Sequence, residues 1–85
     1  MVINNTNNPT IEEQIIKLIS WDFNIPPSKI NTFTDFSDDL HLDAVDRLLL
    51  IANLEKELKV YLSSEEASTI ETVYDAAQCF YKATA

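Results

Sequence analysis

Glycine is absent from this chain of 85 residues, although average usage of about 7% would supply several. Loops that wrap phosphate groups need glycine, because their backbone approaches the ligand closely and adopts positive φ angles. Its absence excludes the phosphate-binding loop of nucleotide hydrolases and the glycine fingerprint of dinucleotide-binding domains. The length leaves room for one small domain.

Basic residues are scarce as well. Six Lys and Arg residues stand against fourteen Asp and Glu residues, which gives a net charge of -8 and a pI near 4.3. Nucleic acids and anionic membrane surfaces are bound by clustered cations, so this composition argues against both ligands. We instead expect basic protein partners that associate in a salt-sensitive manner. The hydrophobic fraction of 46% is ordinary for a folded protein.

Cysteine, histidine and long apolar runs are also rare. Cys79 is the only cysteine and cannot form an internal disulfide, and we expect it to pack in the protein beside Phe80. His41 is the only histidine, so a metal site or a catalytic triad would lack a second imidazole. No run approaches the roughly 20 apolar residues that span a bilayer, and residues 1–9 do not resemble a signal peptide. These features predict a cytoplasmic protein with no catalytic residues, no metal site and no membrane insertion.

The first helix is predicted to begin at Thr10, because Glu13 completes a capping box with it. Its apolar residues recur at helical spacing, at Ile11, Ile15, Leu18 and Ile19. The pattern ends over residues 22–24, before Pro26 and Pro27, which forbid its continuation. A long polar loop over residues 28–39 follows. Five apolar side chains of this region are expected to pack onto the core, namely Trp21, Phe23, Ile30, Phe33 and Phe36.

Three further helices are predicted from their start signals. The second runs from Asp43 to about Lys59, a short third begins at Ser63 or Ser64, and the fourth begins after Thr72. No alternation typical of strands is present. The sequence therefore predicts an all-α, four-helix bundle with a short third helix and a long loop between the first two helices. We expect residues 10–83 to form this single domain and residues 1–9 to form a flexible tail.

The second helix carries two apolar faces. One face, suited to a core, contains Leu50, Ile51, Leu54 and Leu58. The adjoining face contains Val45, Leu48, Leu49 and Ala52, and a domain this small cannot bury a helix on all sides. The second set therefore either packs under the long loop or forms an exposed docking surface edged by carboxylates. Arg47 falls within the core face, and we expect the aliphatic part of its side chain to pack while the guanidinium group reaches water.

Residues 38–46, Asp-Asp-Leu-His-Leu-Asp-Ala-Val-Asp, resemble the signature of acyl carrier proteins, D-L-G-x-D-S-L-D. The similarity continues without gaps through residues 54–58, 64–67 and 70–73, and residues 10–13 look like the start of the first helix of the family. The resemblance implies an acyl-carrier-like bundle that is not itself an enzyme. It also implies a role in type II fatty-acid or polyketide biosynthesis, in which acyl chains are presented on a 4′-phosphopantetheine arm. In a serine-bearing parent, the growing chain would be sheltered between the second and third helices.

The position that matches the attachment serine of the family is Ala44, which follows Asp43. Alanine has no hydroxyl, so the arm cannot be attached at this position. Two explanations are open: a substitution that holds a working carrier in its unmodified form, or a natural carrier-like adaptor or regulator that acts by binding alone. Two further departures are His41, where the family usually has glycine, and Leu49, where an acidic residue is common.

The resemblance also implies the partners and the surface that they read. The partners are a phosphopantetheinyl transferase, a ketosynthase and other acyl-processing enzymes that carry basic patches, and the free protein is expected to be a monomer. The expected partner-binding residues are Asp39, Asp43, Val45, Asp46, Leu48, Leu49, Glu55 and Glu57. Residues 35–46 weakly resemble a calcium-binding loop, but they lack its obligatory glycine. A third hypothesis, that the protein mimics nucleic acid, is supported only by its negative charge.

Overall fold

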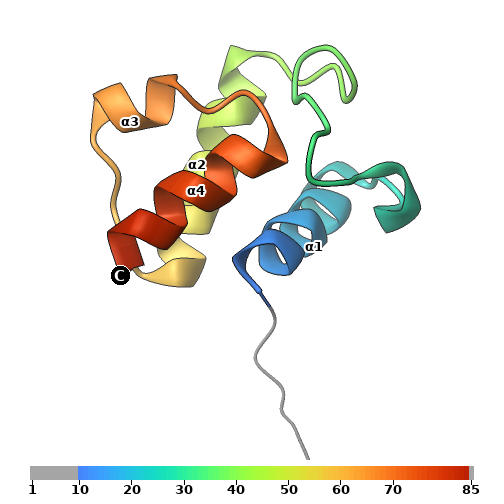
Figure 1. Ribbon diagram of the computed structural model, residues 1–85. Helices are drawn as coiled ribbons and strands as arrows, with labels where there is room; N and C mark the ends of the chain where they lie inside the picture. Colours follow the sequence, from blue (N-terminus) through green and yellow to red (C-terminus); the bar gives the residue numbers. More distant parts are fainter. Residues whose placement is uncertain (1–9, 85) are drawn as a thin grey trace, which may run out of the picture.

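The computed structural model describes residues 10–84, and the predicted tail over residues 1–9 lies outside them. Four α-helices follow one another along the chain: α1 (Ile11–Phe23), α2 (Ala44–Leu58), α3 (Ser64–Ser68) and α4 (Val73–Thr84). A short 3₁₀ turn, η1 (Pro27–Lys29), follows α1. In Figure 1 the short α3 lies beside the ends of α2 and α4, while α1 packs against both long helices. The predicted all-α bundle is confirmed, with its short third helix and its long first connection.

The helices begin where their capping residues predict. Thr10 accepts a hydrogen bond from the backbone N–H of Glu13 (3.1 Å), and the Glu13 carboxylate accepts one from the Thr10 N–H (2.8 Å). Asp43 and Ser63 make the same reciprocal pairs at the starts of α2 and α3. Each box satisfies backbone donors that a helix start otherwise leaves without partners. Asn24 and Lys59 end α1 and α2 in the left-handed conformation, in which the cap N–H reaches back to a carbonyl of the last turn.

One cluster of buried apolar side chains forms the core. It takes residues from α1, α2, α4 and the loops, and its largest fully buried members are Phe36, Phe80, Ile15, Ile19, Leu50, Leu54, Ile70 and Val73. The predicted core face of α2 is confirmed for Leu50, Ile51 and Leu54, while Leu58 is half-buried at the end of the helix. Burial of this face fixes the orientation of α2 and hence of the site on its other side.

The long loop is tied to the beginning of α4 by backbone hydrogen bonds. The N–H of Phe36 donates to the carbonyl of Glu71 (2.8 Å), and the N–H groups of Val73 and Tyr74 donate to the carbonyls of Thr34 and Thr32. These bonds satisfy backbone N–H and C=O groups of the loop that would otherwise be buried without a hydrogen-bond partner. They also fix the position of the loop that leads into α2.

Two aromatic side chains expected in the core are exposed instead. Phe33 is 75% exposed and stacks on Tyr74, with ring centroids 5.9 Å apart, because the loop turns its side chain toward the outer face of α4. Trp21 is 77% exposed, with the ammonium of Lys17 6.0 Å from its ring, because the last turn of α1 rotates position 21 away from the bundle. Ile30 and Phe36 are buried and Phe23 is packed against the core, as predicted. No helix within residues 10–84 combines the length and the apolar character needed to cross a membrane.

Replacement of Leu54 by alanine tests the assignment of the core face. Leu54 is 0% exposed, so Leu54→Ala should lower the free energy of unfolding by about 3 kcal/mol through lost burial and the cavity left behind. Leu48→Ala is the matched control, because Leu48 lies on the same helix and is 66% exposed, and it should cost less than about 0.5 kcal/mol. Urea unfolding measures both values, and similar losses would contradict the assignment.

Candidate functional site

The start of α2 is built around two carboxylates. The backbone N–H of Asp46 donates to Oδ1 of Asp43 (2.8 Å), and the N–H of Asp43 donates to Oδ2 of Asp46 (3.2 Å). Ala44, the first residue of α2, is exposed beside this pair. Both carboxylates lie near the positive end of the helix dipole, which favours negative charge there. The helix start is therefore complete and negatively charged, and the side chain at position 44 takes no part in it.

The loop that precedes α2 uses its carboxylates as turn acceptors. Oδ1 of Asp35 accepts from the N–H groups of Ser37 (2.9 Å) and Asp38 (2.8 Å), and Oδ2 of Asp39 accepts from the N–H of Asp35 (2.8 Å). Within residues 10–84 no group of three or more His, Cys, Asp or Glu side chains is placed to hold a metal ion. The acidic residues that echo a calcium loop thus have a structural role in shaping the turn.

His41 occupies a backbone position that suits glycine. Its φ angle is +58°, in the left-handed region that residues with a Cβ enter at an energetic cost. The backbone conformation explains why the related carriers usually have glycine at the matching position. The imidazole itself is exposed.

The second apolar face of α2 is exposed. Val45, Leu48 and Leu49 are 63%, 66% and 54% exposed, and Ala52 is exposed with them. Of the two alternatives, packing under the long loop is wrong, since that loop is tied to α4 instead. We call Val45, Leu48, Leu49 and Ala52 the apolar strip. Large apolar side chains gathered on one exposed face are typical of an interaction site.

The acidic residues predicted to edge the apolar strip are not equivalent. Oε2 of Glu55 accepts from the N–H of Leu62 (2.8 Å), so this half-buried carboxylate links α2 to the segment before α3. Glu57 is exposed, and so is Asp39, although its carboxylate also closes the loop turn. Asp43 and Asp46 lie at the end of the strip nearest to Ala44. Asp39, Asp43 and Asp46 therefore lie near the start of the strip, whereas Glu55 and Glu57 follow Ala52 in the late turns of α2.

Arg47 does not extend its head to water as expected. It is half-buried, its Nη2 donates to the carbonyl of Ile70, and its Nε is enclosed without a hydrogen-bond partner among the described residues. The guanidinium turns inward because the carbonyl of Ile70, between α3 and α4, lies within its reach. The position of Arg47 inside the predicted core face was the sequence signal for this burial.

A groove of about 690 Å³ lies between α2 and α3. Its walls include Ala44, Arg47, Leu48 and Ile51 from α2, together with Leu62 and Ala67 from the region of α3. The groove opens beside position 44 and is mostly apolar, which fits the expectation that a hydrocarbon chain could be sheltered between these helices. The Arg47 guanidinium in its wall was not anticipated from the sequence.

The short helix α3 depends on its capping box. The backbone N–H of Ser63 and then its hydroxyl stabilise the charged form of Glu66, and they lower the pKa of that carboxyl below its usual value. The Cys79 thiol lies 3.9 Å from the carbonyl of Glu66 and is half-buried, where the sequence predicted a packed thiol. The helix α3, which forms one wall of the groove, is thus stabilised by its capping box and by the contact of Cys79 from α4.

The comparisons with known proteins identify the family. Two acyl carrier proteins from strains of Porphyromonas gingivalis are each 33% identical to this chain over 66 residues, which cover 78% of this chain and 85% of theirs. A solved structure of the acyl carrier protein from Enterococcus faecalis has a TM-score of 0.72 and 27% identity, and the match covers 86% of this chain and 92% of that one. No protein-family model matches the sequence. The chain belongs to the acyl carrier protein family, as the resemblance predicted.

Members of this family are carriers and not enzymes; they carry phosphopantetheine and interact with acyl-processing enzymes. The four-helix arrangement is the fold of that family. The exposed start of α2 therefore belongs to a carrier-type protein.

The capping box at Glu66 predicts a pH-dependent contribution to stability. Because the folded-state pKa is lowered, this contribution is present above the pKa of the unfolded chain and is lost as the pH falls through the folded-state pKa. Ser63→Ala removes the hydroxyl and keeps the backbone N–H, which is the larger cause, so it should raise the pKa of Glu66 part of the way toward its ordinary value, whereas the control Ser64→Ala should not. An NMR titration of the Glu66 side-chain carboxyl measures the pKa, and an unchanged value in Ser63→Ala would contradict the assignment.

The structural role of Asp43 can be separated from its charge. Asp43→Ala removes the acceptor for the Asp46 N–H and should lower the free energy of unfolding by about 1 kcal/mol. Asp43→Asn retains an acceptor oxygen, and asparagine caps helices about as well as aspartate does, so most of the stability should remain. Urea unfolding distinguishes the two variants, and equal losses would mean that the carboxylate acts through charge alone.

Proposed function

We propose that this chain is an acyl carrier protein of type II fatty-acid or polyketide-type biosynthesis in a form that cannot be loaded at position 44. Its remaining activity is the binding of partner enzymes through the exposed face of α2. The observation that carries the proposal is the exposed Ala44 beside an intact pair of capping carboxylates, Asp43 and Asp46. Family membership supports the carrier role.

Phosphopantetheine does not fit position 44 as it stands. Attachment requires a side-chain oxygen that forms a phosphodiester, and the side chain of Ala44 ends in a methyl group. The two nearest carboxylates accept hydrogen bonds within the capping box and cannot replace a serine hydroxyl. No covalent step is therefore assigned to this chain, although a mostly apolar groove opens beside Ala44.

The partner-binding surface follows from the exposed side chains. Asp43 and Asp46 would face Arg or Lys on a phosphopantetheinyl transferase or a ketosynthase, and Val45, Leu48 and Leu49 would supply apolar contact. Apolar side chains surrounded by charge form the usual centre and rim of a protein interface. Asp39 and Glu57 lie at the rim, and Glu55 contributes from its position against Leu62. An unloaded chain with this surface would occupy the docking site of an enzyme without delivering a substrate.

The alternative is a natural carrier-like adaptor or regulator that binds basic partners and has never carried an arm. Both proposals predict binding through α2, and they differ in the origin of Ala44. A serine codon at position 44 of the native gene would indicate a blocked carrier, whereas an alanine codon would indicate natural loss. The cytoplasmic location, the monomeric state of the free protein and the extent of the domain over residues 10–83 remain predictions.

Restoration of the hydroxyl tests the carrier proposal. Ala44→Ser is incubated with coenzyme A and a phosphopantetheinyl transferase of broad specificity, and the intact mass is measured. We expect a gain equal to one phosphopantetheine group, because the surroundings of position 44 are otherwise complete. Ala52→Ser is the matched control, since Ala52 is exposed on the same helix, and it should gain no mass. No gain for Ala44→Ser with a transferase that modifies another carrier would overturn the proposal.

A further inference from the structure

The exposed face of α2 does not end with the apolar strip. Val45, Leu49, Ala52 and Lys56 follow one another at intervals of four, three and four residues, so they lie on one side of the helix. Lys59, seven residues after Ala52, continues the same face into the C-terminal cap. Both lysine side chains are exposed. Along its length α2 therefore begins with the carboxylates of Asp43 and Asp46, continues with this apolar face and ends with ammonium groups.

Two of the few basic residues of this acidic chain lie close together at the end of α2. Lys56 lies in the last turn of α2 and Lys59 is its C-terminal cap, and with Lys17 in the middle of α1 they are half of the six basic residues of the chain. The amide of Asn53 donates to the carboxylate of Asp22 (2.7 Å), which holds the end of α1 beside the later turns of α2. The nearby acidic groups are Asp22 and Glu55, whose carboxylates accept hydrogen bonds from Asn53 and Leu62, and the exposed Glu57.

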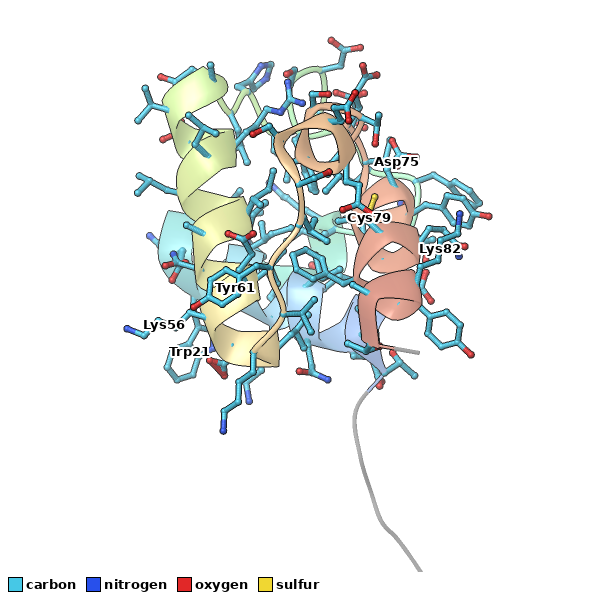
Figure 2. All side chains as sticks on the ribbon, turned by 90° about the vertical axis from the view of Figure 1, so that its left-hand side faces the viewer. Trp21, Lys56, Tyr61, Asp75, Cys79 and Lys82 are labelled. Atoms are coloured by element: carbon cyan, nitrogen blue, oxygen red, sulfur yellow. The ribbon has the colours of Figure 1, made fainter. Side chains whose placement is uncertain are left out.

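Two exposed aromatic side chains accompany the lysines. Figure 2 shows Lys56, Trp21 and Tyr61 on the opposite side of the view from Asp75, with Trp21 coming from the end of α1 and Tyr61 from the segment after α2. Trp21 directly precedes Asp22, whose carboxylate is bound by Asn53 of α2. Tyr61 is 82% exposed and lies two residues after the cap of α2. Exposed Trp and Tyr beside cations are enriched in protein interfaces, because their rings offer both apolar area and a polar edge.

We propose that α2 presents a charge-polarised docking face and that its partner is a protein with the complementary order of groups. That partner carries cations opposite Asp43 and Asp46, an apolar centre, and carboxylates opposite Lys56 and Lys59. The rise of an α-helix separates positions 46 and 56 by about 15 Å, which sets the spacing of the opposing groups. The proposal rests on the proposed function only in using α2 as the docking helix.

The order of charges discriminates between partners. A uniformly basic docking face would match the beginning of α2 but would place cations against the two lysines, and such like-charge contacts disfavour binding. A face with carboxylates at that end gains attraction at both ends and is aligned in one direction only. Lys56 and Lys59 are thus the residues that determine specificity and orientation, while the apolar strip supplies contact area.

Two helical peptides with the same apolar face serve as probes. The polarised peptide carries two Arg residues at one end and two Glu residues at the other, ordered to lie antiparallel to α2, and the uniform peptide carries four Arg residues. Fluorescence anisotropy at two salt concentrations measures the binding of both peptides to the full chain. The wild type should bind the polarised peptide about threefold to tenfold more tightly, as expected for two exposed charge contacts.

Charge reversal at the two lysines completes the test. Lys56→Glu with Lys59→Glu should reverse the preference in favour of the uniform peptide. Lys29→Glu with Lys82→Glu changes the net charge by the same amount at exposed lysines outside α2, and it should leave the preference for the polarised peptide in place. Equal or tighter binding of the uniform peptide by the wild type would overturn the proposal, as would equal effects of the two double variants or no binding of either peptide.

This readout involves no prosthetic group, so its result is independent of whether Ala44→Ser accepts an arm. A mass gain together with no peptide preference would leave the carrier proposal standing and remove the polarised face. The opposite pair of results would retain the polarised face on a protein that is an adaptor and not a blocked carrier.

Discussion

Burial of one face of α2 is the constraint on which the rest of the structure depends. Leu50, Ile51 and Leu54 enter the core against α1 and α4, and this contact fixes the rotation of the helix about its axis. Helical geometry then leaves Leu48 and Leu49 no place but the surface. The same rotation aims the first residue of the helix at the groove beside α3. One packing choice therefore produces both the exposed apolar strip and the site at position 44.

The start of α2 tolerates alanine at position 44 because capping is assigned to its neighbours. The carboxylates of Asp43 and Asp46 each accept a hydrogen bond from the backbone N–H of the other residue, so the capping box forms without a hydroxyl at position 44. Alanine is moreover the residue with the highest helix propensity. Structure and attachment chemistry are thus separable at this site, and the fold persists when the chemical handle is lost.

Local signals made the helices and their ends predictable from the sequence, and spatial neighbours decided what remained unpredicted. The capping residues Thr10, Asp43 and Ser63 marked three helix starts because each acts within three residues of its partner. By contrast, Arg47 is turned inward by the carbonyl of Ile70, which lies 23 positions away. The exposed Trp21 and Phe33 likewise depend on how the end of α1 and the long loop are rotated by packing. The apolar strip was partly predictable, since periodicity separated its face from the core.

The order of charges along α2 has a consequence for the divergence of this protein. Asp43 and Asp46 lie at the N-terminal end of the helix, and Lys56 and Lys59 lie at its C-terminal end beside Glu55 and Glu57; the helix dipole stabilises the placement of both the aspartates and the lysines. Exchange of the two groups would set every one of them against the dipole. Substitutions that would suit a partner with the opposite order of charges would therefore also destabilise the helix. Selection for a stable helix thus preserves the orientation in which a partner binds.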